Sequence, residues 1–267
     1  MNRAYVHGYS AKENQRLQDQ ATTLTDLLHA DSLFPPGSQI LEAGCGVGSQ
    51  TLTLARKNPQ AIFTSIDISA SSIEQARQKV LAAGCQNVQF QQADIFALPF
   101  QPEFFDHVFV CFVLEHLQHP EEALVCLQRV LKPGGTITVI EGDHGSAYFY
   151  PNSKEAHRAI NCQILLQAAS GGNALIGREL YPLLVKSGLN AVKVSPRMVY
   201  VDASKPELVD GFIRKTFTAM IEGVRERALA ENLIEAGTFD KGICDLYRTA
   251  DTDGTFCYTF FKATGSK

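Results

Sequence analysis

Three glycines at alternate positions, preceded by an acidic residue, form the motif in this chain that could most readily do chemistry. Gly44, Gly46 and Gly48 follow an apolar run that contains Glu42. Glycine has no side chain and adopts backbone conformations closed to other residues, so such a loop can turn sharply and approach a ligand closely. Residues 49–57 have helical character, and their first amide groups would face that ligand. The pattern predicts a nucleotide-cofactor site.

The spacing of the glycines distinguishes between cofactors. Dinucleotide-binding loops follow the pattern G-x-G-x-x-G, and here Ser49 and Gln50 stand where the third glycine should fall. The glycine spacing therefore disfavours an NAD(P)-dependent oxidoreductase, which we keep as an alternative function. A protein that binds a cofactor without catalysing a reaction is a further alternative.

Acidic residues also end neighbouring strand-like runs. Asp67 closes the run 62–67, at the place where an acid in this kind of fold reaches the ribose diol of an adenosine. Asp94 follows the next run. Ligands of open α/β sheets bind at the carboxyl ends of the strands, so we expect these acids at one site. The alternatives are a solvated loop acid for Glu42, a turn acid or helix cap for Asp67, and a turn cap for Asp94.

This combination resembles motif I and the following strand ends of the class I S-adenosylmethionine-dependent methyltransferases. The resemblance implies that the E-x-G-x-G-x-G loop holds the amino-acid end of S-adenosylmethionine, with Glu42 accepting from its ammonium group. It further implies that Asp67 binds the ribose, Asp94 faces the adenine amino group, and S-adenosylhomocysteine is the product. The remaining cofactor-binding residues that it implies are Tyr5, Tyr9, Arg16, Cys45, Ile68, Ile95, Cys111, Phe112 and His116.

The segment after the fourth strand-like run offers a candidate base. Residues 107–113 lead into a Leu-Glu-His sequence, which resembles the post-strand signature of small-molecule methyltransferases. His116 could act as a general base or contact the cofactor, and a histidine packed at a helix start is the alternative. Cys111 is better explained as a small apolar side chain than as a nucleophile. An Asn-Pro-Pro-Tyr signature is absent, which counts against methylation of nucleic-acid amino groups.

A polar and aromatic loop, residues 141–150, follows the fifth run. We expect the methyl acceptor here, because His144 could take a proton from a hydroxyl or amine while Asp143 or Glu141 orients it. The alternative is a hydrogen-bonded turn. Positioning alone can supply about 7–11 kcal/mol of the barrier to an in-line displacement, so a base is not indispensable. Asp143 and His144 are adjacent and would point apart, so no metal site is expected.

Alternating strand-like and helical runs must position these residues. The pattern predicts an α/β fold of the Rossmann-like kind, with a seven-stranded, mostly parallel sheet and helices on both faces. The expected strands are residues 39–43, 62–67, 88–92, 107–113, 136–141, 191–200 and 255–262. The expected helices are residues 49–57, 69–83, 120–131 and 177–187, and the Lys-Pro-Gly-Gly sequence at 132–135 should end the third of them.

Helical insertions are expected after the fifth and sixth strands, at about 147–172 and 205–250. We expect both to form a lid over the acceptor. Residues 1–35 are predicted to be an N-terminal helical arm, and residues 36–267 a methyltransferase domain that carries the insertions.

The N-terminal arm is rich in tyrosine and resembles the leading segment of some methyltransferases. The resemblance implies that Tyr5 or Tyr9 covers the sulfonium and that Arg16 pairs with the cofactor carboxylate. The alternative is an amphipathic surface helix, residues 13–29, packed on the sheet through its leucines.

Composition and charge restrict the class of protein. The chain has 267 residues, of which 45% are hydrophobic and 19% charged, and its net charge is −4. No basic face or long apolar span is apparent, so neither nucleic acid nor a membrane is expected as partner. The seven cysteines are odd in number and lack a C-x-x-C pair, and no secretory signal is apparent, which favours a cytoplasmic location. The expected function is methyl transfer to a small molecule by a monomer or homodimer.

Overall fold

Five parallel strands form the part of the sheet that carries the glycine loop. They are β1 (Gln39–Ala43), β2 (Ile62–Asp67), β3 (Val88–Gln92), β4 (Phe105–Cys111) and β5 (Leu131–Gly142). Strand β1 pairs with β2 and β4, β2 also pairs with β3, and β4 with β5, always in parallel. Ala43 lies beside Ile66 and Val110, so the carboxyl ends of three strands meet at one edge.

Three further strands complete the sheet, which has eight strands rather than the expected seven. They are β6 (Tyr148–Tyr150), β7 (Asn190–Val201) and β8 (Thr255–Ser266). The order is β3-β2-β1-β4-β5-β8-β6, with β7 also paired to β8. Strand β6, which was predicted as loop, pairs antiparallel with residues 255–257 of β8. Three residues are too short a run for an alternating pattern to identify.

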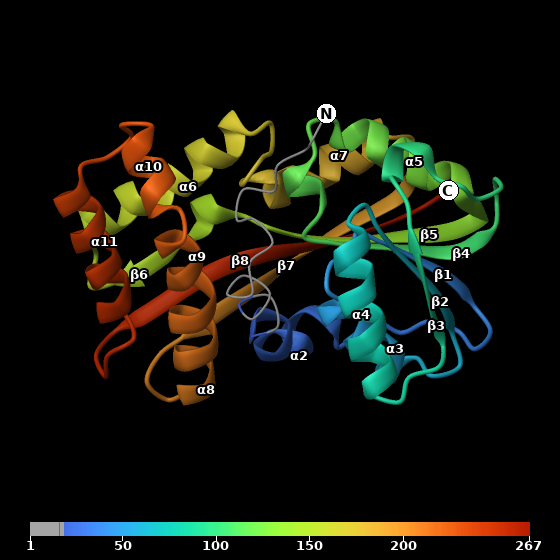
Figure 1. Cartoon of the computed structure of the whole chain (residues 1–267), viewed down its shortest axis with the longest axis horizontal. Coiled ribbons are helices and arrows are strands. Elements are labelled where there is room, and N and C mark those ends of the chain that lie inside the picture. Colours follow the sequence, from blue (N-terminus) through green and yellow to red (C-terminus); the bar gives the residue numbers. More distant parts are fainter. Residues whose placement is uncertain (1–15, 17–18) are drawn as a thin grey trace. The chain divides into compact units, whose positions relative to one another are not determined.

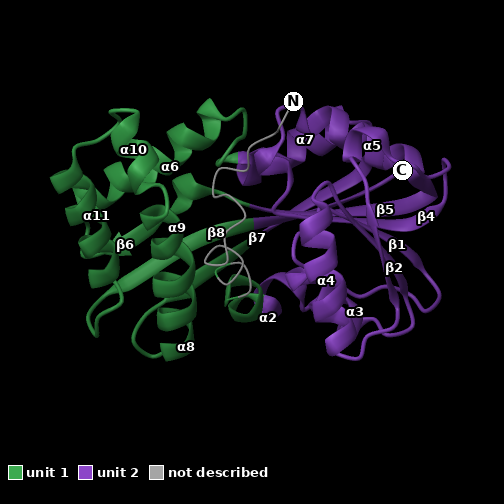
Figure 2. Cartoon of the chain, viewed as in Figure 1, with its two compact units in different colours: residues 1–24, 142–175, 197–260 green, residues 25–141, 176–196, 261–267 purple. Residues whose placement is uncertain are grey.

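The computed structural model describes residue 16 and residues 19–267, which form two compact units (Figure 2). Unit 2 consists of residues 25–141, 176–196 and 261–267. Unit 1 consists of residues 142–175 and 197–260 together with the N-terminal segment up to residue 24. A bilayer-spanning helix is absent from the part of the chain that the structure describes.

The helices of unit 2 cover both faces of its sheet, as predicted (Figure 1). Helix α3 (Ser49–Lys57) packs with α4 (Ala70–Ala82) on one face, and α5 (Pro120–Val130) packs with α7 (Leu180–Lys186) on the other. Ser69 caps α4 by accepting a hydrogen bond from the Ser72 amide. The remaining helical elements are α2 (Thr25–His29) and the short 3₁₀ turns η1 (Ile95–Ala97), η2 (Leu114–His116) and η4 (Ile176–Glu179).

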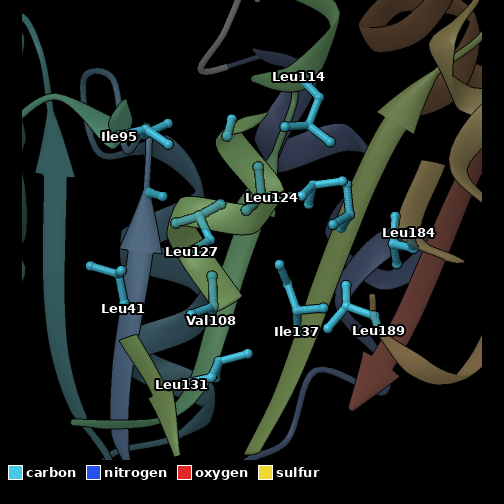
Figure 3. Close-up of a cluster of buried hydrophobic side chains, with 14 of the residues drawn as sticks. Leu41, Ile95, Val108, Leu114, Leu124, Leu127, Leu131, Ile137, Leu184 and Leu189 are labelled. Atoms are coloured by element: carbon cyan, nitrogen blue, oxygen red, sulfur yellow. The ribbon is translucent and has the colours of Figure 1, made fainter. Parts of the chain in front are cut away.

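Apolar side chains between α5, α7 and the sheet form the core of unit 2 (Figure 3). Leu124 and Leu127, three positions apart on α5, are fully buried. This spacing puts both on one face of the helix. They join a cluster that includes Leu41 of β1, Val108 of β4 and Ile137 of β5. Packing against α5 thus holds strands β1, β4 and β5 in place.

The Lys-Pro-Gly-Gly sequence follows the end of α5, as predicted, but it lies within the fifth strand rather than before it. Helix α5 already ends at Val130, and residues 132–135 lie within β5. They form an irregularity in its pairing, because the register moves from Phe105 beside Leu131 to His107 beside Thr136. An insertion of this kind bends a strand without ending it.

Unit 1 contains the helices of both predicted insertions. Helix α6 (Lys154–Ala169) begins after Ser153, whose hydroxyl accepts from the Ala156 amide. A second helical stretch starts with α8 (Pro206–Leu208), continues through the π-helix η5 (Val209–Thr218) and ends with α9 (Ala219–Glu222). Helices α10 (Arg225–Ala230) and α11 (Ala236–Arg248) follow. A side chain at Gly242 of α11 would collide with the Glu155 backbone of α6, so the two insertions pack closely on one another.

Residues 1–15 and 17–18 of the predicted N-terminal arm lie outside the described residues, and they include Tyr5, Tyr9 and Leu17. Of the leucines expected to pack on the sheet, Leu24 and Leu28 are buried. Arg16 is also buried, and its guanidinium donates to the Gln20 side chain at 2.9 Å. The salt bridge from Arg16 to the cofactor stays a prediction.

Helix α2 is tied to β8 by a buried lysine. The Lys262 ammonium donates to the Leu28 carbonyl at 3.1 Å, to Asp31 at 2.6 Å and to the Ser32 hydroxyl at 2.8 Å. Next to it, His29 is fully buried, and its Nε2 donates to Gln50 of α3 at 2.7 Å. Burial lowers the pKa of His29 to about 4 from 6.5. The imidazole is therefore neutral in the folded protein at neutral pH.

The neutral state of His29 predicts a loss of stability in acid. As the pH falls below 6.5 the unfolded chain takes up a proton that folded His29 resists, so the free energy of unfolding decreases until about pH 4. Between pH 7 and pH 5.5 we expect a loss of about 1 kcal/mol from this group. Glu42, whose pKa is raised to about 7, contributes in the opposite direction over this range. The His29 contribution is therefore the change, between the two pH values, in the difference in free energy of unfolding between the wild type and His29→Gln, measured with urea. The same substitution at the exposed His119 should give no such change.

Candidate functional site

The glycine loop connects β1 to α3, and its glycines are required for different reasons. Gly44, Gly46 and Gly48 all have left-handed φ angles, of 79°, 51° and 76°. A side chain at Gly44 would collide with Val113, and one at Gly48 would lie 2.8 Å from the Cβ of Ala76 on α4. Only at Gly46 is the space within 4 Å empty of protein atoms. Close approach to a ligand is therefore expected at Gly46. The lack of a side chain at Gly44 and Gly48 instead leaves space for Val113 and Ala76.

Asp67 fixes the loop from the end of β2. One carboxylate oxygen accepts from the Gly46 amide at 2.9 Å, and the other accepts from the Ser69 amide at 2.9 Å. Burial raises the pKa of Asp67, and these backbone hydrogen bonds oppose the rise. A carboxylate offers about four lone-pair positions, so Asp67 can still accept from a ribose hydroxyl. The bond to Gly46 was not anticipated from the sequence.

Glu42 lies inside the sheet rather than on the loop surface. It is 3% exposed, and the Ser65 hydroxyl of β2 donates to it at 2.6 Å. Burial raises the pKa of Glu42 to about 7, and the neighbouring Asp67 adds to the rise. The alternative of a solvated loop acid is therefore wrong. Its hydrogen bond to the cofactor ammonium stays a prediction.

Asp94 caps the turn η1, as its alternative interpretation proposed. Its carboxylate accepts from the Phe96 amide at 2.9 Å. The adjacent Ile95 is buried, whereas Ile68 after β2 is 53% exposed. Capping uses one oxygen of Asp94, so the predicted contact with the adenine amino group remains chemically possible and stays a prediction.

The segment after β4 turns sharply into η2. Strand β4 ends at Cys111, and Phe112 has a φ of 57°, a conformation that bulky residues rarely adopt. Burial raises the pKa of the Cys111 thiol well above its usual value, which supports an apolar rather than a nucleophilic role. His116 ends η2, with its Nε2 3.6 Å from the Glu115 carboxylate. Its catalytic or cofactor-binding role stays a prediction.

Glu141 has partners that the sequence did not suggest. Its Oε1 accepts from the amides of Val113 at 3.0 Å and Leu114 at 2.7 Å. The expectation that Glu141 orients His144 is therefore not supported by its hydrogen bonds, which go to the segment after β4. The sequence around Glu141 does not reveal these hydrogen bonds, because the two backbone amides lie about thirty positions earlier in the chain.

The predicted acceptor loop in unit 1 is a hydrogen-bonded turn that also holds a histidine in place. Asp143 accepts from the Gly145 amide at 3.0 Å and caps η3 (His144–Ser146). The Nδ1 of His144, which is 8% exposed, lies 2.7 Å from the Tyr258 hydroxyl of β8. A side chain at Gly142 would collide with that hydroxyl. Tyr258 was missed because it lies 114 positions away in the sequence.

Aromatic side chains surround the pair formed by His144 and Tyr258. Phe212 and Phe217 of η5 lie 5.9 and 5.5 Å from the Tyr258 ring, measured between centroids. Phe256 and Phe260 of β8 belong to the same cluster. The His144 ring itself lies 6.5 Å from Phe217 and 5.9 Å from Tyr258, so the histidine contacts this aromatic cluster directly.

The fold and the glycine loop define a class I methyltransferase architecture, and comparison with known families agrees. Residues 35–188, more than half of the chain, match the methyltransferase domain family. The chain belongs to this family.

Curated relatives of the chain include small-molecule enzymes. The 27-O-demethylrifamycin SV methyltransferase of Amycolatopsis mediterranei is 27% identical over 236 residues, which cover 88% of this chain and 80% of that protein. The ubiquinone/menaquinone biosynthesis C-methyltransferase UbiE of Pseudomonas paraeruginosa is 30% identical over 190 residues, 70% of each chain. Three other curated relatives match over a smaller part of their length, and the match covers only 54%, 35% and 48% of it.

Solved structures share the fold. Phosphoethanolamine N-methyltransferase 2 of Haemonchus contortus, in complex with S-adenosyl-L-methionine, has a TM-score of 0.57 at 16% identity. The alignment covers 93% of this chain and 52% of that one. The [4+2]-cyclase SpnF has a TM-score of 0.54 at 20% identity, over 93% of this chain and 80% of the cyclase. At such identities the likeness concerns the fold alone, and the cyclase shows that one fold serves different chemistries.

Proposed function

We propose that this protein transfers a methyl group from S-adenosylmethionine to a small-molecule acceptor. The observation that carries the proposal is the open space at Gly46, whose amide is held by Asp67 while its Cβ position faces no protein atom. A loop of this kind accommodates the amino-acid end of the cofactor. When bound, the cofactor supplies an electrophilic methyl carbon, and its sulfur keeps the bonding electron pair as the acceptor forms the new bond.

The residues of unit 2 would hold and orient the cofactor. Gly46 and its neighbours would receive the amino-acid end, Asp67 the ribose, and Asp94 with the Ile95 backbone the adenine. Glu42, buried in β1, would accept from the ammonium group in its ionised form. The other proposed cofactor contacts are Tyr5, Tyr9, Arg16, Gly44, Cys45, Gly48, Ile68, Cys111, Phe112 and His116.

Calorimetry and methyl transfer test the proposal. The protein should bind S-adenosylhomocysteine and not NAD, because the third glycine of the dinucleotide pattern is missing. Incubation with methyl-labelled S-adenosylmethionine and cell-extract metabolites should label a small molecule. Binding of NAD alone would favour the oxidoreductase alternative, and cofactor binding without any transfer would favour a non-catalytic binding protein.

The pKa of Glu42 predicts that cofactor affinity depends on pH. A cationic ammonium favours the ionised carboxylate, and half of this group is protonated at about pH 7. The dissociation constant for S-adenosylhomocysteine should therefore rise about fivefold from pH 7 to pH 6, measured by calorimetry. Glu42→Gln should bind more weakly and without this dependence. The pKa of Asp67 is also raised, and its protonation would weaken binding in the same pH range. If the affinity of Glu42→Gln still falls between pH 7 and pH 6, the pH dependence belongs to Asp67 and not to Glu42.

For the acceptor, we propose that unit 1 supplies the binding residues. Both helical insertions belong to this unit, and we propose that they form a lid over the acceptor. In the tautomer with its proton on Nδ1, His144 donates to Tyr258, and Nε2 is the nitrogen that would take a proton from an acceptor hydroxyl or amine. The rifamycin and quinone relatives act on small molecules, which supports the same acceptor class here.

We also propose a cytoplasmic location. All seven cysteines are free thiols, as expected of a chain in a reducing compartment.

A further inference from the structure

A buried carboxyl group in unit 2 has no role in the proposed chemistry. Glu141 is fully buried near the end of β5. Its Oε1 accepts from the Val113 and Leu114 amides, whereas its Oε2 is buried and has no hydrogen-bond partner among the described residues. Burial raises the pKa of Glu141 well above its usual value, and the nearby Glu115 adds to the rise. A carboxyl group in such a place requires an explanation, because an apolar side chain would be easier to bury.

The hydrogen bonds of Glu141 hold the chain where it leaves β4. Phe112 adopts a left-handed conformation with a φ of 57°, and its amide donates to the Ile140 carbonyl at 2.9 Å. Such a turn persists only when its surroundings impose it. The next two amides cannot pair along the sheet, because β4 has ended, and Glu141 accepts from both.

The held segment in turn touches the glycine loop. The side chain of Val113 occupies the space in which a Cβ at Gly44 would lie. Gly44 and Cys45 are themselves bound through their amides to the Ile66 carbonyl of β2, at 2.8 and 2.9 Å. The loop is therefore fixed from the β2 side by backbone bonds and is contacted on the other side by Val113, whose backbone Glu141 holds.

We propose that Glu141 is a positioning residue of the cofactor site, which holds residues 112–114 against Gly44 through a carboxyl oxygen that accepts from two backbone amides. The inference rests on the cofactor site proposed above. It requires an acceptor atom at Oε1 and does not require a negative charge. Glutamine can supply the acceptor, whereas methionine has a similar length but offers only a weakly accepting thioether.

Two substitutions separate this role from a general need for a filled core. Calorimetry with S-adenosylhomocysteine should give a dissociation constant raised at least about tenfold in Glu141→Met, because the amides of Val113 and Leu114 lose their acceptor and the segment moves. Glu141→Gln should stay within about threefold of the wild type. Glu74→Gln, a change in an exposed acid of α4, is the matched control. Tight binding by Glu141→Met, or equally weak binding by Glu141→Gln, would overturn the proposal.

A measurement without cofactor distinguishes failure of this inference from failure of the proposed function. Hydrogen exchange of the Val113 and Leu114 amides should be at least about tenfold faster in Glu141→Met than in the wild type, and protected in Glu141→Gln. Unchanged exchange would contradict the positioning role even if the wild type bound no cofactor.

A further variant serves if Glu141→Met does not fold. Val113→Ala leaves both hydrogen bonds of Glu141 in place, since they go to backbone amides, and removes the contact with Gly44. It should weaken S-adenosylhomocysteine binding several-fold, and wild-type affinity would contradict the proposed path from Glu141 to the loop.

Discussion

Replacing Gly46 by alanine is expected to weaken S-adenosylhomocysteine binding at least about 100-fold while the protein remains folded. The added Cβ meets no protein atom, so the fold loses only about 1–2 kcal/mol from the left-handed backbone at φ 51°. The same Cβ would project into the space that we assign to the cofactor. Calorimetry gives the affinity, and urea unfolding gives the stability.

Gly84 provides a matched control for Gly46. It follows α4 with a φ of 75°, and a Cβ there would also meet no protein atom. Gly84→Ala should therefore lower stability by a similar amount and leave the affinity unchanged. If Gly46→Ala bound as tightly as Gly84→Ala, the cofactor would not occupy the loop.

The second large effect is expected at His144. If this residue takes a proton from the acceptor, His144→Gln should lower kcat on the order of 10²–10⁴-fold, the usual contribution of a general base, with cofactor affinity unchanged. Tyr258→Phe removes the hydroxyl that lies 2.7 Å from Nδ1 and should cause a smaller loss, because the imidazole stays but its tautomer is no longer fixed. The kcat of both variants can be measured as the rate at which they transfer labelled methyl groups to the metabolite that the wild type methylates.

His119 is the control for His144. It is an exposed histidine of unit 2 and lies outside both insertions and the loop 141–150. His119→Gln should leave kcat unchanged. Full activity of His144→Gln would mean that the acceptor reacts already deprotonated and that positioning alone is sufficient.

Much of unit 2 could be predicted from the sequence. The bounds of β1, β2, β3 and α3 agree with those expected, because short apolar runs between glycines, prolines and acids are local signals. The acids at the strand ends were also found in this way, since their positions follow from the strands.

The contacts of those residues could not be predicted. Asp67 with Gly46, Glu141 with Val113, and His144 with Tyr258 are hydrogen bonds between positions that the fold brings together. A side chain that binds a distant backbone amide leaves no periodic pattern in the chain. Strand β6 was missed for a related reason, because its three residues are defined by pairing with β8 and not by their own sequence.

The bond from Lys262 to Leu28 also bears on the order in which the protein can fold during synthesis. The two residues are 234 positions apart, which a ribosome needs about 10–50 s to translate at 5–20 residues per second. Throughout that interval the nascent chain already carries the complete glycine loop, yet helix α2 lacks its buried partner and β5 lacks its neighbour β8. The last segment of unit 2 is therefore translated only after all segments of unit 1, so the cofactor-binding unit is the last to be completed.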